Sequence, residues 1–187
     1  MPRSLYQYIH VIRKDLLQKF PYVTPHNVPR LTHIALHVST GKAITDPSIL
    51  VPCVFALETI TGQHPSITKA HRSVAAFKLR EGMVLGCEVT LRHRGMYDFL
   101  DRFVTQVLPR VQEFYGLPAQ SVDALGHYTY GVPSLLHFPE LDPYHETLGR
   151  LGGLQVTFGT NASTKEEVLA LLSGFQLPFV SDQPKVV

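Results

Sequence analysis

Basic side chains and histidines gather in one stretch of the sequence, from Gly62 to Arg94. The stretch holds six lysines and arginines against two glutamates, together with three histidines and a single large ring, Phe77. Basic side chains in such a number, with a single large ring among them, indicate a surface that attracts a polyanion and not a packed core. The composition of this stretch therefore predicts a surface that is presented to phosphate.

The sequence contains no comparable pattern for catalysis. It has no Cys-pair or HExxH spacing, no nucleophile elbow and no glycine-rich nucleotide fingerprint. Glu140 and Asp142 lie near His137 and His145, which leaves open a small hydrolytic site, although a turn packed with polar residues explains the cluster better. We therefore expect a protein that is not an enzyme and has no catalytic residues, metal site or cofactor.

Charge is divided unevenly along the chain. Residues 1–110 carry fourteen Lys/Arg and seven Asp/Glu, a net of +7, whereas residues 111–187 carry three and eight, a net of −5. A basic half can dock on a polyanion while an acidic half faces elsewhere. Uneven solvation charge is the alternative, but the split favours RNA binding over a protein-interaction domain that merely has a basic patch.

Length and composition indicate one globular domain over residues 1–187. Hydrophobic residues make up 44% of the chain and charged residues 17%, and no apolar run approaches the roughly 18 residues of a membrane span. The two isolated cysteines favour a reducing compartment. Residues 1–20 have apolar positions at helical spacing and are expected to form an N-terminal helix.

Two alternating segments are expected to be strands with one polar face each. In residues 31–39, His33 and His37 lie on the more polar face. Thr90 and Arg92 do so in the second segment. If the two strands share a sheet, His37, Thr90 and Arg92 lie on one open face. That face carries few rings, which favours docking on folded RNA over the stacking of single-stranded bases.

Residues 70–83 have no period and are flanked by glycines, so we expect a long exposed loop between two strands. Further helices are expected at 96–108 and from Thr164, and the stretch between them reads as a hairpin. The order of elements predicts an α+β fold, with a largely antiparallel sheet and helices packed on one side.

The segment SITKAHRSVAAFKLREGMVLGCEVTLR closely resembles the signature of the universal large-subunit ribosomal protein L5 family, of bacterial and organellar type. The resemblance begins near Leu5 and continues, in order, through VPR, MYDFLDRFVTQVLPRVQEFYGL, GHYTYGV, FPELD, GLQVTF and TKEEVLALL. It covers nearly the whole chain and is far more specific than any single motif.

The resemblance implies a protein of the central protuberance of the large ribosomal subunit, bound to 5S rRNA and other large-subunit rRNA beside neighbouring proteins. It also implies that the long loop contacts P-site tRNA and that another part meets a small-subunit head protein at an intersubunit bridge. The residues expected to bind rRNA are His33, His37, Gln63, Thr90, Arg92 and Arg94. Those expected to bind tRNA are Lys69, Arg72, Ser73, Phe77, Lys78 and Arg80. No membrane partner is implied.

Several positions depart from the usual pattern of that family. His37 stands where the family usually has asparagine, His64 where it has lysine, Leu125 where it has arginine, and Gly152 where arginine is common. Each lost cation lowers the affinity for RNA and makes that affinity less dependent on salt concentration. The pattern favours a mitochondrial ribosome over a plastid or bacterial one. The alternative function is an extraribosomal RNA- or protein-binding module without catalysis.

Overall fold

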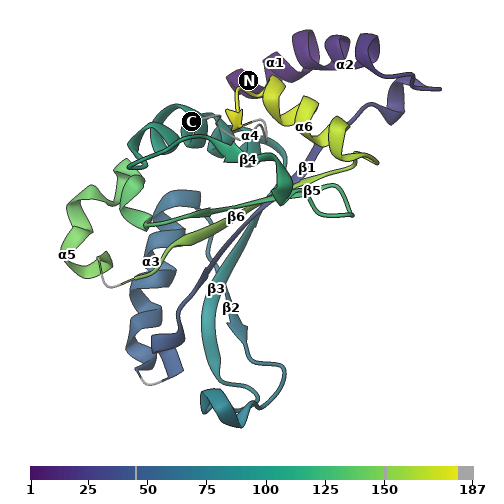
Figure 1. The fold of residues 1–187 in the computed structure, drawn as a ribbon. Coiled ribbons are helices and arrows are strands. Elements are labelled where there is room, and N and C mark those ends of the chain that lie inside the picture. Colours follow the sequence, from purple (N-terminus) through teal and green to yellow (C-terminus); the bar gives the residue numbers. More distant parts are fainter. Residues whose placement is uncertain (45, 150, 181–187) are drawn as a thin grey trace, which may run out of the picture. The chain divides into compact units, whose positions relative to one another are not determined.

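The computed structural model describes residues 1–44, 46–149 and 151–180. It is an α+β fold in which helices and strands are mixed along the chain (Figure 1), and it confirms the predicted fold class. The helices are α1 (Arg3–Gln7), α2 (Arg13–Lys19), α3 (Leu50–Thr61), α4 (His93–Arg102), α5 (His145–Leu148) and α6 (Lys165–Gly174). The strands are β1 (Leu31–Ser39), β2 (Ser66–Lys69), β3 (Val84–Leu91), β4 (Leu117–Pro118), β5 (His127–Val132), β6 (Leu154–Thr160) and β7 (Phe179–Val180).

The chain forms two compact units. The terminal unit comprises Met1–Ile34, Arg92–Tyr130 and Thr157–Val187, and the hairpin unit comprises Ala35–Leu91 and Gly131–Val156. A five-stranded sheet has the order β2-β3-β1-β6-β5, and β1, β5 and β6 contribute residues to both units. The single domain over residues 1–187 stays a prediction.

In the hairpin unit, helix α3 packs against strand β3. Cys87, Val89 and Leu91 are buried, while Glu88 and Thr90 between them are exposed, so β3 has the predicted alternation. Cys53 on α3 is also fully buried, and burial raises the pKa of its thiol to about 11. One face of β3 is therefore apolar, and the other presents polar side chains to solvent.

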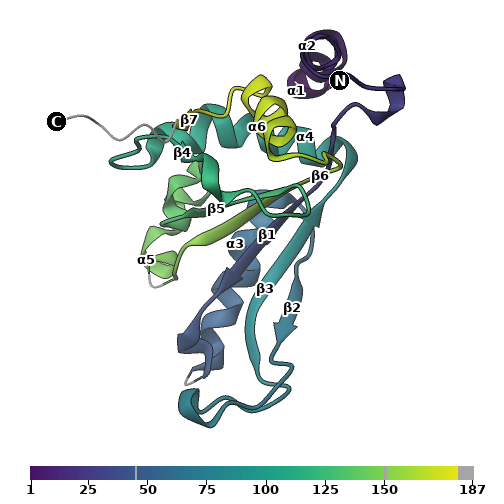
Figure 2. The same ribbon diagram turned by 45° about the vertical axis from the view of Figure 1, so that its right-hand side comes forward.

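Strands β2 and β3 form an antiparallel hairpin (Figure 2), in which Ser66 pairs with Glu88 and Ile67 with Cys87. The register shifts between Thr68 and Lys69, which is a bulge near the tip of the hairpin. The two strands hold residues 70–83 at their far end, where the sequence predicts the exposed loop.

Gly86 is the one residue of β3 for which packing requires a glycine. A Cβ there would overlap the carbonyl oxygen of Val38 and lie 3.0 Å from Cα of Ser39, so strand β1 would have to shift. We expect Gly86→Ala to lower the free energy of unfolding by about 1–3 kcal/mol, the usual range for overpacking.

Gly95 supplies the matched control for that substitution. A Cβ at Gly95, on α4, meets no atom within 4 Å, so Gly95→Ala should leave stability unchanged or raise it by up to about 1 kcal/mol. Urea unfolding of both variants measures the difference. Equal stability of the two would contradict the close approach of β3 to β1.

In the terminal unit, the predicted N-terminal helix is interrupted by a π-helical turn, Tyr8–Ile12, between α1 and α2. Ile12 and Leu16 are buried, as expected for apolar positions at helical spacing, whereas Ile9, within the π-helical turn, is 39% exposed. Helix α6 begins with a capping box, in which Thr164 and Glu167 bond each other's backbone N–H groups. None of the described helices combines the length and the apolar character needed to cross a bilayer.

The hairpin expected after α4 is reduced to a tight turn and an isolated antiparallel bridge between Val122 and Tyr128. Strand β4 pairs in parallel with β7, and β5 instead takes the edge of the large sheet beside β6. Pro118 has no N–H to donate, so β4 is only two residues long and cannot extend into a hairpin ladder. Its backbone is held instead by a bond from the N–H of Leu117 to the carbonyl oxygen of Pro178.

Candidate nucleic-acid interface

The end of the β2–β3 hairpin is a folded tip rather than an open loop. Backbone hydrogen bonds join Ala70 to Met83 and Gly82 to Ala70, at 2.8 and 2.9 Å. Farther out, Val74 and Leu79 form an isolated bridge around a single 3₁₀ turn, Ala75–Phe77. These bonds restrict the segment that the sequence predicts to be a loop, so its side chains are held on a defined frame.

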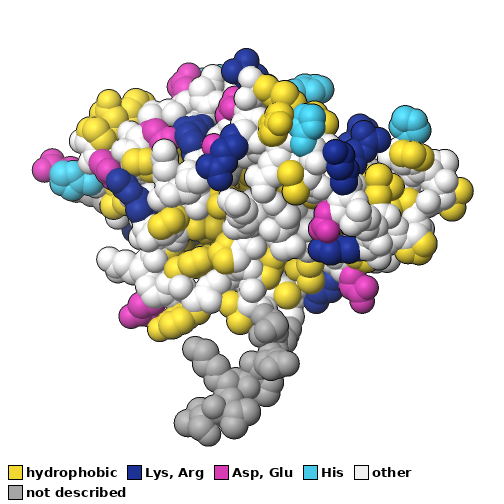
Figure 3. Space-filling view, turned by 90° about the horizontal axis from the view of Figure 1, so that it is seen from above, with side chains coloured by type: hydrophobic (Ala, Val, Ile, Leu, Met, Phe, Trp, Pro, Cys, Tyr) yellow, Lys and Arg dark blue, Asp and Glu magenta, His cyan; other side chains and the backbone are white. Residues whose placement is uncertain are grey.

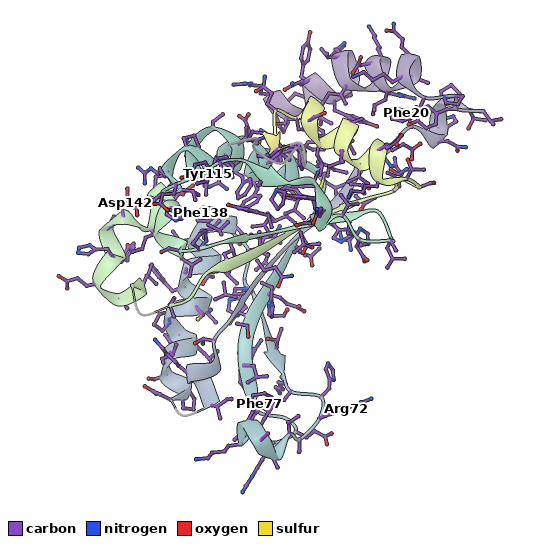
Figure 4. All side chains as sticks on the ribbon, in the orientation of Figure 1. Phe20, Arg72, Phe77, Tyr115, Phe138 and Asp142 are labelled. Carbon is purple, nitrogen blue, oxygen red and sulfur yellow. The ribbon has the colours of Figure 1, made fainter. Side chains whose placement is uncertain are left out.

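Exposed cations surround this tip. Lys69, Arg72, Lys78 and Arg80 are exposed, and among the described residues none of the four forms an ion pair with a carboxylate. Phe77 is 73% exposed, and it lies near Arg72 at the end of the hairpin (Figure 4). An exposed ring among unpaired cations is the combination that binds a phosphate backbone and stacks on a base or sugar.

Two residues of the tip have structural roles in addition. The hydroxyl of Ser73 accepts a hydrogen bond from the N–H of Glu81 at 2.9 Å. Ser73 therefore braces the tip, whether or not it also contacts a ligand. Lys78 has a φ of 53°, in the left-handed region that non-glycine residues seldom adopt. A strained, charged residue at an exposed turn suggests a function that requires its position.

On the sheet of the hairpin unit, His37 is half-buried on β1 and Thr90 is exposed on β3, and these strands are neighbours. Gln63 lies elsewhere, in the turn that follows α3. Gly62 ends that helix with a φ of 68°, and the N–H of Gln63 donates to Oγ1 of Thr61. The structure thus brings two of these three predicted rRNA residues to the sheet and leaves Gln63 exposed beside it.

In the terminal unit, a second polar patch forms around His33. Its imidazole lies against Gly159, where any Cβ would overlap the ring, and meets the ring of His127 edge-on at 5.8 Å between centroids. Burial, Arg92 and His127 together hold the pKa of His33 below its ordinary value. We name Arg92, His33 and His127 the cationic row.

His127 is the member of the cationic row that sequence reasoning missed. It begins strand β5, and the buried Tyr128 beside it shows that the odd-numbered positions of β5 face away from the core. The GHYTYGV segment held this signal, but it becomes useful only when β5 is known to join the large sheet instead of a local hairpin.

Arg94 is exposed on α4 and its Nε lies 3.6 Å from Oδ2 of Asp98. This carboxylate offsets part of its charge, so Arg94 is a weaker phosphate ligand than an unpaired arginine. In the view of Figure 3, lysines and arginines are interspersed with carboxylates and apolar side chains, and this face has no continuous basic surface.

The cluster around His137 lies on two short 3₁₀ helices, Leu135–His137 and Pro139–Tyr144, and on the start of α5. Pro139–Tyr144 is a 3₁₀ helix, with Phe138 and Leu141 buried. A cavity of about 410 Å³ in the hairpin unit is lined by Asp46, Ser48, Ile49, Pro52, Glu146, Thr147 and Leu151. It includes none of the four residues that the hydrolytic alternative requires.

Comparison with known proteins finds matches over nearly the whole chain. A family model described as "Ribosomal protein L5" matches residues 24–80, and one described as "ribosomal L5P family C-terminus" matches residues 84–179. A large ribosomal subunit protein uL5 from Variovorax paradoxus is 44% identical over 96% of this chain and 99% of its own length. A large ribosomal subunit protein uL5m from Reclinomonas americana is 39% identical over 95% of this chain and 98% of its own length.

These matches cover almost the full length of both this chain and its relatives. The family is structural and non-enzymatic, which confirms the expectation that the protein is not an enzyme. The chain belongs to the ribosomal protein L5 family.

Proposed function

We propose that this large-subunit ribosomal protein anchors on 5S rRNA, or on an equivalent rRNA, through the polar side of its sheet and presents the hairpin tip to P-site tRNA. The unpaired cations and the exposed Phe77 on a braced tip carry the second part of the proposal. Such a tip binds a sugar–phosphate backbone without reading its sequence, which suits a ligand that changes at every elongation step.

The anchoring part is supported by different residues. His37 and Thr90 supply hydrogen-bonding groups in the hairpin unit, and Arg92 and His33 supply them in the terminal unit. Hydroxyl, imidazole and guanidinium groups serve 2′-OH and phosphate contacts on folded RNA. Gln63 and Arg94 extend these surfaces as exposed polar side chains.

We further propose a mitochondrial ribosome as the site of action, with neighbouring large-subunit proteins and a small-subunit head protein as partners. The neutral residues Leu125 and Gly152, at positions where the family usually has arginine, support an altered RNA surface. The uL5m relative from Reclinomonas americana is compatible with this compartment, and the bacterial relatives are compatible with a bacterial one.

Sedimentation of tagged protein from its own cells tests the proposal against an extraribosomal RNA- or protein-binding module. A ribosomal constituent should move with large-subunit particles and copurify with rRNA and large-subunit proteins. Protein that stays near the top of the gradient and recovers neither would support the extraribosomal module instead.

A further inference from the structure

The hydrogen bonds around His33 fix which ring nitrogen carries the proton. The hydroxyl of Thr32 donates to the carbonyl oxygen of Gly159 at 3.0 Å, and Oγ1 of Thr32 lies 2.9 Å from Nδ1 of His33. A hydroxyl has one proton to donate, so here Oγ1 must accept from an N–H on Nδ1. The neutral imidazole therefore has its proton on Nδ1 and a bare lone pair on Nε2.

Nε2 is the atom of His33 that a ligand can reach. It has no partner among the described residues, and it is not one of their buried unpaired atoms. Gly159 presents no side chain beside the ring, and the charged or titratable groups that act on His33 are Arg92 and His127. As a lone pair, Nε2 repels a phosphate oxygen; as an N–H⁺, it donates to that oxygen.

His127 has a different role. Its Nδ1 is buried without a partner, so a proton there would be a buried donor with no acceptor. Either tautomer of His127 leaves Nδ1 unpaired, so its role beside His33 rests on the edge-on contact of the two rings. Within the cationic row, Arg92 is a permanent charge, and His33 is the group for which we argue a change of charge.

We propose that Nε2 of His33, flanked by Arg92 and His127, is a proton-linked contact for an RNA phosphate. Binding takes one proton from solvent onto Nε2, and release returns it. This inference rests on the proposed function, since the phosphate belongs to the rRNA on which the protein anchors.

The direction of the effect follows from the charges. In the free protein, burial, Arg92 and His127 lower the pKa of His33, so the ring is neutral near pH 7. A bound phosphate favours the imidazolium and raises that pKa, so affinity should increase as the pH falls. We expect the protein to bind a 5S rRNA transcript about fivefold more tightly at pH 6 than at pH 8 and fixed salt.

Two substitutions at position 33 separate charge from shape. His33→Gln should bind weakly at both pH values, and His33→Lys, which stays charged, should bind tightly at both. His145→Gln, at an exposed histidine of α5, should keep the pH dependence of the wild type. Circular dichroism at each pH checks that the variants are folded, because a lowered histidine pKa destabilises the free protein as the pH falls below about 6.5.

NMR of the His33 ring gives a second readout that does not depend on affinity: its pKa should rise when the transcript is added. Tight binding by the wild type together with an unchanged pH dependence in His33→Gln would overturn the inference and leave the proposed function intact. Failure of the wild type to bind the transcript at either pH would overturn both.

Discussion

Replacing Lys78 and Arg80 together by alanine should impair translation while leaving the protein on the large subunit. The two side chains are exposed on the braced hairpin tip, and neither forms an ion pair among the described residues. At about 1 kcal/mol for each lost phosphate contact, tRNA affinity should fall by about tenfold or more. Peptide synthesis at limiting tRNA, compared with the amount of protein in purified large subunits, measures the two effects separately.

The matched control removes the same charge elsewhere. Lys14→Ala with Lys165→Ala takes away two exposed lysines on α2 and α6 of the terminal unit, which belong to neither proposed surface. This variant should translate as the wild type does. Equal losses of assembly and translation in Lys78→Ala with Arg80→Ala would contradict the assignment of the tip to tRNA.

Arg92→Ala should have the largest effect on binding to rRNA. Arg92 is exposed at the start of α4 and contributes a permanent charge to the cationic row. Removing one phosphate contact should weaken binding to a 5S rRNA transcript by about tenfold. It should also reduce the steepness of the slope of log K against log salt concentration by about 0.7–0.9. Filter binding at several salt concentrations measures both quantities.

Arg94→Ala is the internal comparison for that experiment. Both arginines are exposed, but Arg94 already interacts with Asp98 at 3.6 Å, so its removal should change affinity and the salt slope less. An equal change in the two variants would mean that general charge, and not the placement of Arg92, attracts the RNA.

Much of the fold could be predicted from local patterns. Strand β3 was predictable because Cys87, Val89 and Leu91 alternate with polar residues, and α6 because Thr164 and Glu167 form a capping box. The interruption of the N-terminal helix was not, since a π-helical turn keeps helical backbone angles and leaves little trace in sequence spacing.

The pairing of strands was the larger difficulty. Sequence proximity favoured a hairpin for the segment that contains β4 and β5, whereas β4 pairs with β7 more than 60 residues away. Such pairing depends on contacts distant in the chain, which alternation alone does not encode. His127 was missed for this reason, because its neighbour His33 lies on another strand.

The residues of the candidate site were predictable, but the hydrogen bonds that hold them were not. The basic residues of the tip follow directly from the sequence, yet the role of Ser73 as a brace depends on a hydrogen bond to Glu81. The proton position on His33 likewise depends on Thr32 and Gly159, which carry no charge and match no binding motif.

A density map of the protein in its large-subunit particle with tRNA in the P site tests the division into an anchoring surface and a tRNA-binding tip most directly. The account predicts rRNA phosphates against Arg92 and His33, and tRNA within contact distance of Phe77, Lys78 and Arg80. A map with rRNA wrapped around the hairpin tip, or with Arg92 and His33 facing only protein, would contradict it.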